Sequence, residues 1–224
     1  TGEAGGIGGQ STKDLWEYDQ VANSWTPKAD FAGSKIKNAT GISISDKGYL
    51  VCGWAGAYKK ETWEYDPFDD TWSKRADFGG NGRTMGVGFA IGNAGYIGTG
   101  ESGGINQKDF WQYEPATDTW TKKADYGGGE IGWSAGFAID NEGYLGTGYS
   151  WGIGYRNIFW KYTPAAEPSC TVPSRLTSAN ITATSAELNW DATANAKGYK
   201  IVYEMTDGSG PLKTTFEKTG SKVI

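Results

Sequence analysis

The chain has 224 residues, a formal net charge of −5 and no histidine, and it is rich in glycine (35 residues) and tryptophan (11 residues). This length can bury one large core or two small ones, and abundant glycine and aromatic residues favour short strands and tight turns over helices. The lack of histidine excludes His-activated nucleophiles and imidazole metal sites, and the negative charge argues against nucleic-acid binding. No apolar run is long enough to span a bilayer, so we expect no membrane span.

The sequence contains an internal repeat. A tryptophan recurs at spacings of 47, 48 and 49 residues, a tyrosine follows it two residues later, and a second tryptophan follows the first three copies after nine residues. The repeated aromatic residues are Trp16, Tyr18 and Trp25; Trp63, Tyr65 and Trp72; Trp111, Tyr113 and Trp120; and Trp160 and Tyr162. We call these repeats 1 to 4. An Ala-Asp-aromatic segment, "ADF" or "ADY", ends each of repeats 1 to 3.

Each repeat divides into short predicted strands. In repeat 3 they are residues 87–92, 95–100, 109–115 and 119–126. Two-residue turns are predicted between the first two strands, at Asp46-Lys47, Asn93-Ala94 and Asn141-Glu142. Because side chains alternate along a strand, Trp111 and Tyr113 share one face. The recurrence of this Trp-x-Tyr pair predicts that the face is packed in every repeat.

Four-stranded repeats of this period, with a glycine-rich second strand and a fixed tyrosine-to-tryptophan spacing, resemble kelch repeats. The resemblance covers residues 1–164, although the double glycine usual in that family is replaced here by Gly-Thr-Gly or by Cys52-Gly53. It implies an all-β fold of about 3.5 four-stranded β-propeller blades in an incomplete ring. The repeats look like those of kelch-type propellers in surface or secreted proteins of Bacteroidetes-like bacteria.

Both ends of the repeat array fall inside a repeat. Thr1 aligns with Thr99, in the middle of repeat 3, and repeat 4 has no tryptophan-bearing fourth strand. We expect the chain to be a fragment of a larger propeller. The alternative is a homodimer in which two chains complete one ring.

The sequence after the repeats changes character. Residues 165–172, rich in proline and alanine, are interpreted as a linker. Residues 173–224 resemble a partial fibronectin type III domain, with Trp190 at the end of the second predicted strand and Tyr199 and Tyr203 in the third. The predicted strands lie within residues 175–182, 185–191, 198–205 and 211–220.

No motif for catalysis or metal binding stands out. Kelch-type copper oxidases need histidines, and the chain has neither a calcium-binding Asp-x-Asp-x-Asp run nor a phosphate-binding glycine loop. We therefore expect no catalytic residue, cofactor or metal. Cys52 is predicted to be a small buried apolar residue. Cys170 either pairs with a cysteine outside this chain or is a free thiol.

Ligand binding is predicted at two sets of loops, those that join strands two and three and those that join one repeat to the next. The family resemblance implies that these loops share one face, and their sequences differ between repeats while the strands agree. The candidate binding residues are Trp54, Tyr58, Arg83, Met85, Glu101, Glu130, Trp133, Trp151 and Tyr155. The alternative is that the aromatic residues pack back against the sheet edges.

The predicted function is that of a non-catalytic extracellular adhesion module that binds a protein or a glycan at this loop face. One alternative is the carbohydrate-binding part of a secreted polysaccharide-active enzyme whose catalytic residues lie outside this chain. Another is a structural component of a cell-surface assembly. We expect a secreted or cell-surface location, contacts with neighbouring domains of the parent chain, and no nucleic-acid partner.

Overall fold

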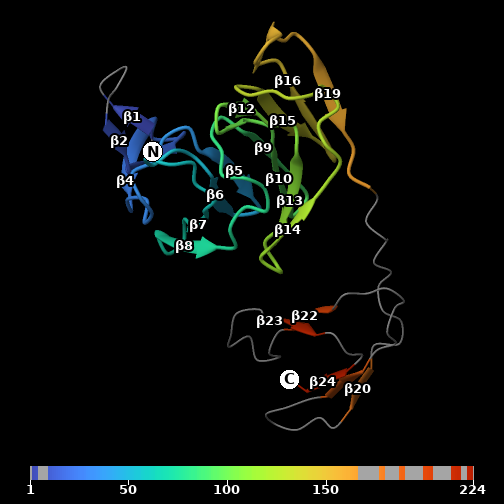
Figure 1. Ribbon diagram of the computed structural model, residues 1–224. Helices are drawn as coiled ribbons and strands as arrows, with labels where there is room; N and C mark the ends of the chain where they lie inside the picture. The colour runs from blue at the N-terminus through green and yellow to red at the C-terminus, as the bar shows by residue number, and fades with distance from the viewer. Residues whose placement is uncertain are drawn as a thin grey trace. The chain divides into compact units, whose positions relative to one another are not determined.

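A computed structural model of the protein describes residues 2–4 and 10–165, and five short strands farther along the chain (Figure 1). The described residues form strands, turns and bends and no helix, so the predicted all-β class is confirmed. None of them lies in a helix long and apolar enough to cross a membrane. The chain divides into two compact units, Thr1–Thr163 and Pro164–Ile224.

Repeats 2 and 3 each form a four-stranded antiparallel sheet whose strands follow one another in chain order. Repeat 2 contains β5 (Thr40–Ile44), β6 (Lys47–Val51), β7 (Thr62–Asp66) and β8 (Thr71–Arg75). Repeat 3 contains β9 (Val87–Ile91), β10 (Ala94–Gly98), β13 (Phe110–Glu114) and β14 (Thr119–Lys122). The four strands predicted for a repeat are therefore present in both.

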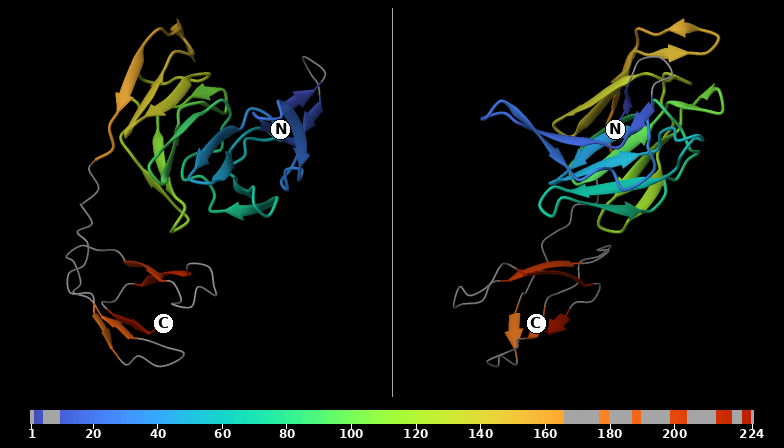
Figure 2. Two further views of the ribbon diagram at one scale, coloured as in Figure 1. Left: turned by 180° about the vertical axis from the view of Figure 1, so that it is seen from behind. Right: turned by 90° about the vertical axis from the view of Figure 1, so that its left-hand side faces the viewer.

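Repeats 1 and 4 form smaller sheets. Repeat 1 contains β3 (Leu15–Asp19) paired with β4 (Ser24–Lys28), and repeat 4 contains β15 (Ala135–Ile139), β16 (Glu142–Gly146) and β19 (Phe159–Tyr162) in that order. In repeats 1, 3 and 4 a short two-stranded hairpin comes directly before the strand that carries the Trp-x-Tyr pair. These hairpins are β1 (Gly2–Ala4) with β2 (Gln10–Thr12), β11 (Glu101–Ser102) with β12 (Ile105–Asn106), and β17 (Tyr149–Ser150) with β18 (Gly154–Tyr155). Figure 2 shows the sheets of this compact unit succeeding one another in chain order without closing into a barrel.

The tight turns between the first two strands lie one residue earlier than the sequence predicted. In repeat 3, Ile91 pairs with Ala94, so the turn residues are Gly92 and Asn93. The equivalent turns are Ser45-Asp46 and Asp140-Asn141. The prediction was wrong because the first turn residue takes the positive φ, between 53° and 57°, and glycine, serine or aspartate adopts it here.

Neighbouring sheets pack glycine against large apolar side chains. A Cβ added to Gly88 in β9 would lie 2.7 Å from Ile42 in β5, and a Cβ added to Gly143 in β16 would lie 2.2 Å from Phe89 in β9. The glycine faces of the repeat 3 and repeat 4 sheets therefore receive the large side chains of the preceding sheet. This explains why the first two strands of these repeats are rich in glycine.

The Ala-Asp-aromatic segment at the end of a repeat packs on the next sheet. Phe31 lies edge-on against Trp63 and Trp72, with ring centroids 5.4 Å and 5.1 Å apart. The segment's backbone is held as well, because the Ala29 N–H donates to Asp70 (2.9 Å) and Trp72 Nε1 donates to the Ala29 carbonyl (3.2 Å). The repeated tryptophans thus join successive repeats.

The same arrangement recurs one repeat later. Phe78 lies edge-on against Trp111 (5.9 Å) and Trp120 (4.9 Å). The Ala76 N–H donates to Asp118 (2.9 Å), and Trp120 Nε1 donates to the Ala76 carbonyl (3.2 Å). Because the aromatic and hydrogen-bond contacts match in these two copies, they define the interface between successive repeats.

The tryptophan of the Trp-x-Tyr pair is covered best where both halves of this arrangement are present. Trp63 and Trp111 are half-buried, whereas Trp16 is 50% and Trp160 is 48% exposed. The prediction that this face is packed in every repeat is therefore wrong for repeat 1 and for the tryptophan of repeat 4, although Tyr162 packs against the core. In the described part of the chain, no Ala-Asp-aromatic segment covers Trp16, and no tryptophan-bearing fourth strand flanks Trp160.

The second compact unit contains two small antiparallel sheets. One is formed by β20 (Thr177–Ala179), β21 (Glu187–Asn189) and β24 (Ser221–Val223), and the other by β22 (Tyr199–Tyr203) and β23 (Lys213–Glu217). Strands β20 to β23 lie within the four predicted stretches, and β24 was not predicted. Residues 166–172 of the predicted linker, with Cys170, and Trp190 lie outside the described residues.

Candidate functional site

Three backbone bridges join the two sets of loops in which ligand binding is predicted. The bridged pairs are Lys37 with Trp54, Thr84 with Glu101, and Gly132 with Tyr149. In the last pair each backbone N–H donates to the other residue's carbonyl at 2.9 Å. The two sets of loops therefore meet at equivalent places in repeats 2, 3 and 4.

A Thr-Gly pair turns the chain from the second strand of repeat 4 into its loop. Thr147 and Gly148 both have positive φ, 57° and 99°. Glycine is required at the second position, because a Cβ on Gly148 would lie 2.5 Å from the Gly132 carbonyl oxygen. This close approach places Tyr149, the next residue, beside the loop that carries Trp133.

Cys52 takes the threonine position of this turn in repeat 2, with a φ of 62°. The thiol is buried, and burial raises its pKa to about 12. It therefore stays protonated and unreactive at neutral pH. This environment agrees with the expectation of a small buried apolar residue.

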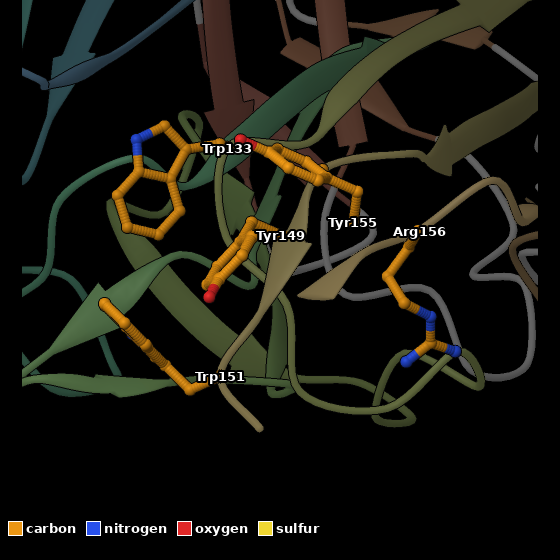
Figure 3. Close-up of a pocket in the computed structure, with 6 residues that line it drawn as sticks. Trp133, Tyr149, Trp151, Tyr155 and Arg156 are labelled. Carbon is orange, nitrogen blue, oxygen red and sulfur yellow. The ribbon is translucent and has the colours of Figure 1, made fainter. Parts of the chain in front are cut away.

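A surface cavity of about 530 Å³ lies among the loops of repeat 4 (Figure 3). It is lined by Trp133, Gly148, Tyr149, Trp151, Tyr155 and Arg156. Four of these six residues are aromatic, and they come from the loop before β15 and from the β17–β18 hairpin. The hairpin and the inter-repeat loop together form the walls.

Tyr149 lies at the centre of the aromatic group. Its ring is nearly perpendicular to Trp133 (6.1 Å between centroids, 90°) and Trp151 (5.2 Å, 87°), and it also contacts Tyr155 (5.4 Å, 74°). The outer rings remain accessible, since Trp151 is 56% and Tyr155 is 91% exposed. The edge-to-face contacts fix the rings while leaving flat faces open to a ligand.

Polar contacts hold the cavity-lining hairpin in place. The Trp151 backbone N–H donates to Oδ1 of the buried Asn106 (2.8 Å), and the Arg156 N–H donates to the Gly148 carbonyl (2.9 Å). The Arg156 guanidinium donates to the Gly128 carbonyl at 3.3 Å. A guanidinium has five N–H donors, so Arg156 retains donors for a ligand in the cavity.

Trp54, Tyr58 and Glu101 form a second group, apart from the cavity lining. Trp54 and Tyr58 pack edge-on with centroids 4.9 Å apart, and the Tyr58 hydroxyl donates to Glu101. Glu101 also accepts the Gly104 N–H at 2.8 Å. The hydrogen bond to Glu101, together with burial, raises the pKa of Tyr58. These side chains join the loops of repeats 2 and 3 to each other.

Arg83 is the clearest departure from the predicted set of binding residues. Its side chain is 0% exposed and forms two hydrogen bonds with the Asp109 carboxylate, at 2.7 and 2.8 Å. It also donates to the Thr99 carbonyl (2.9 Å), and its guanidinium carbon lies 4.6 Å from the centre of the Phe78 ring. Arg83 is therefore a buried structural residue with no surface to offer a ligand.

Two other candidates also lie apart from the cavity lining. Met85 is half-buried, its N–H donates to the Asn38 carbonyl (3.0 Å), and its carbonyl accepts the Trp133 N–H (3.3 Å), so its backbone connects three loops. Glu130 is exposed but does not line the cavity. Of the nine candidates, the structure brings together Trp133, Trp151 and Tyr155.

Sequence reasoning missed Tyr149 and Arg156, although both lie in a predicted loop. Tyr149 occupies the position of Trp54 and Glu101, as the three equivalent bridges show. Comparing the repeats at that position would have indicated that the residue starts each loop at the shared edge. Arg156 had no equivalent signal in the sequence.

No family model and no curated protein matches this chain. A solved structure titled "Structure of YjhT" is similar in fold, with a TM-score of 0.58 and 15% sequence identity. The match covers 79% of this chain and 65% of that chain, so this protein spans slightly less than two thirds of the length of that solved structure. At this identity the likeness concerns the fold alone.

Proposed function

We propose that the chain is a non-catalytic glycan-binding module and that the aromatic cavity of repeat 4 is its binding site. The observation that carries the proposal is the open group of four aromatic rings beside Arg156. Sugar rings present apolar C–H faces that stack on exposed indole and phenol rings, and their hydroxyls accept hydrogen bonds from a guanidinium. The cavity volume, about 530 Å³, suits a ligand of one or a few sugar units.

The same proposal includes the fold of the two compact units. The repeated four-stranded sheets are blades of a kelch-type β-propeller, and the second compact unit is a partial fibronectin type III domain. The chain-order topology of the sheets and the stacking of successive inner strands support the first assignment. Such a module belongs to a secreted or cell-surface protein, where glycans and other surface proteins are available.

A glycan array probed with the 224-residue chain tests the proposed function, followed by titration of the best ligand. Trp151→Ala and Tyr155→Ala each remove one exposed ring, and we expect each to weaken binding about tenfold or more. Phe68→Ala provides a control, because Phe68 is an aromatic residue in a turn of repeat 2 that is as exposed as Tyr155 and more exposed than Trp151. Circular dichroism checks that all variants fold.

Two outcomes would contradict the assignment. One is the absence of any saturable glycan binding. The other is a glycan whose affinity falls equally in Phe68→Ala and in the two cavity variants, since the effect would then not belong to the cavity.

A further inference from the structure

Arg156 supplies the charge of the aromatic cavity. It is half-buried, and the other described residues that line the cavity are aromatic or glycine. Its guanidinium donates to the Gly128 carbonyl at 3.3 Å, and in the described part of the chain it forms no ion pair with a carboxylate. In Figure 3 the guanidinium lies away from the indole rings of Trp133 and Trp151. The cavity therefore combines a positive charge that no acidic side chain neutralises with flat apolar rings.

The backbone holds this position in the same way in three repeats. In each of them, one residue of the loop that leads to the third strand donates its N–H to the carbonyl of the glycine that turns the chain out of the second strand. The pairs are Lys59 with Gly53 (2.8 Å), Gln107 with Gly100 (2.8 Å) and Arg156 with Gly148 (2.9 Å). The fold thus accepts both a cationic and a neutral side chain at this place.

A guanidinium recognises an oxyanion better than it recognises a hydroxyl. Its planar N–H groups match the two oxygens of a carboxylate, or two oxygens of a phosphate-like group such as a sulfate, with a pair of parallel hydrogen bonds. These charge-assisted bonds are about twice as strong as bonds between neutral groups. Water also screens a half-buried charge less than an exposed one. The chemistry at Arg156 therefore favours an anionic group on the ligand.

We propose that the cavity binds an acidic glycan, with Arg156 contacting the carboxylate or sulfate of a sugar whose apolar face stacks on the aromatic rings. This inference rests on the proposed function and adds the chemical class of the glycan. The chain has a net charge of −5, so it does not attract anions in general. A preference for acidic glycans has to come from the local contact with Arg156.

The glycan array is probed with the unmodified 224-residue chain, with Arg156→Gln and with Lys59→Gln. Arg156→Gln introduces the residue type that repeat 3 already has at this place, as Gln107. Lys59→Gln is the matched control, because Lys59 is also half-buried, occupies the equivalent position of repeat 2 and does not line the cavity. We expect acidic glycans to bind the unmodified chain and the control, and to bind Arg156→Gln about tenfold or more weakly.

Titration then compares the best-bound acidic glycan with the same glycan after its carboxylate has been reduced to an alcohol or its sulfate has been removed. For the unmodified chain we expect the neutral form to bind about tenfold or more weakly. For Arg156→Gln the two forms should bind almost equally. This comparison distinguishes a carboxylate from a sulfate, and its first part needs no substitution in the protein.

Two results would overturn the acidic ligand. One is that neutral glycans bind the unmodified chain as tightly as acidic ones do. The other is that Arg156→Gln and Lys59→Gln weaken binding equally, since the effect would then come from overall charge. In the first case a loss of binding in Trp151→Ala would still support the proposed function, so the two proposals can fail separately. The absence of any glycan binding would contradict both.

Discussion

At the scale of single residues, the most unusual feature is the ion pair between Arg83 and Asp109. The side chain of Arg83 is fully buried, while the same position in repeats 2 and 4 carries Ile36 and Ile131, both buried. A buried ion pair stabilises little relative to well-packed apolar residues, but breaking it leaves an uncompensated charge. Replacing Arg83 alone should therefore lower the free energy of unfolding, whereas replacing both Arg83 and Asp109 by apolar residues should restore most of it.

We expect Arg83→Ala to lower the free energy of unfolding by about 3–5 kcal/mol, because it strands the Asp109 carboxylate in a mostly buried place. The double variant Arg83→Ile with Asp109→Ile should recover most of this loss. Repeat 4 provides the precedent, with Ile131 and Ile158 at the two positions. Urea unfolding followed by circular dichroism measures both, and a double variant no more stable than Arg83→Ala would contradict the argument.

The pH dependence of stability offers a second measurement on the same pair. Burial raises the pKa of Asp109, but the hydrogen bonds and the charge of Arg83 outweigh burial and hold the pKa below its usual value of 3.8. A carboxyl group of this kind contributes stability that is present above its unfolded pKa and is lost as the pH falls through its folded pKa. The stability difference between the unmodified chain and the double-isoleucine variant should therefore shift against the unmodified chain below about pH 4.

The burial of Arg83 was readable from the sequence, but only by comparing repeats. Aligning the Ala-Asp-aromatic segments places Arg83 between two isoleucines, which indicates a core position. The prediction instead relied on the residue's own polarity and placed it on the surface. The Asp109 partner was not predictable, because it comes from the start of the third strand and the contact depends on how the two loops approach each other.

At the scale of elements, the turns before β8 and β14 hold the end of the previous repeat by hydrogen bonds. Asp118 has a φ of 50° and accepts hydrogen bonds from the Ala76 N–H and from the Tyr113 hydroxyl (2.7 Å). Asn23 has the same conformation in repeat 1, with a φ of 49°, and accepts the Tyr18 hydroxyl (2.8 Å). Asparagine can therefore replace aspartate in this turn.

We expect Asp118→Ala to destabilise the chain by about 1–3 kcal/mol, since it leaves two donors without their acceptor and puts alanine at positive φ. Asp118→Asn should cost much less, because the amide oxygen keeps both bonds and asparagine tolerates this φ. Thermal unfolding of the two variants provides the comparison. Equal destabilisation by both would show that the charge of Asp118, rather than its acceptor geometry, is what matters.

The elements were the most predictable part of the fold. The period of the tryptophans and the alternation along each strand located the strands of repeats 2 and 3, because both patterns depend only on local geometry. The exposure of Trp16 and Trp160 was not predictable in the same way. It depends on which neighbouring segments cover a face, and a repeat pattern treats every copy as equally covered.

At the scale of the whole first compact unit, stability depends on sheets that stack glycine face against large side chains. Each repeat contacts its neighbours through the inner strands, with β5 against β9 and β9 against β15. Such an array gains stability at every interface between repeats. The space next to the glycine face differs between the repeat 2 sheet and the repeat 3 sheet. A Cβ on Gly41 would meet nothing within 4 Å, whereas one on Gly88 would lie 2.7 Å from Ile42.

Gly41 and Gly88 occupy the same position in β5 and β9, so they form a matched pair for testing the stacking. We expect Gly88→Ala to destabilise the chain by about 1–3 kcal/mol, because the added methyl group must push the β9 sheet away from Ile42. Gly41→Ala should be neutral or slightly stabilising, because the methyl group meets no neighbour and alanine restricts the unfolded chain. Urea unfolding of both variants separates the two effects. If Gly41→Ala proves as costly as Gly88→Ala, then the requirement for glycine comes from the strand itself and the stacking of sheets does not explain it.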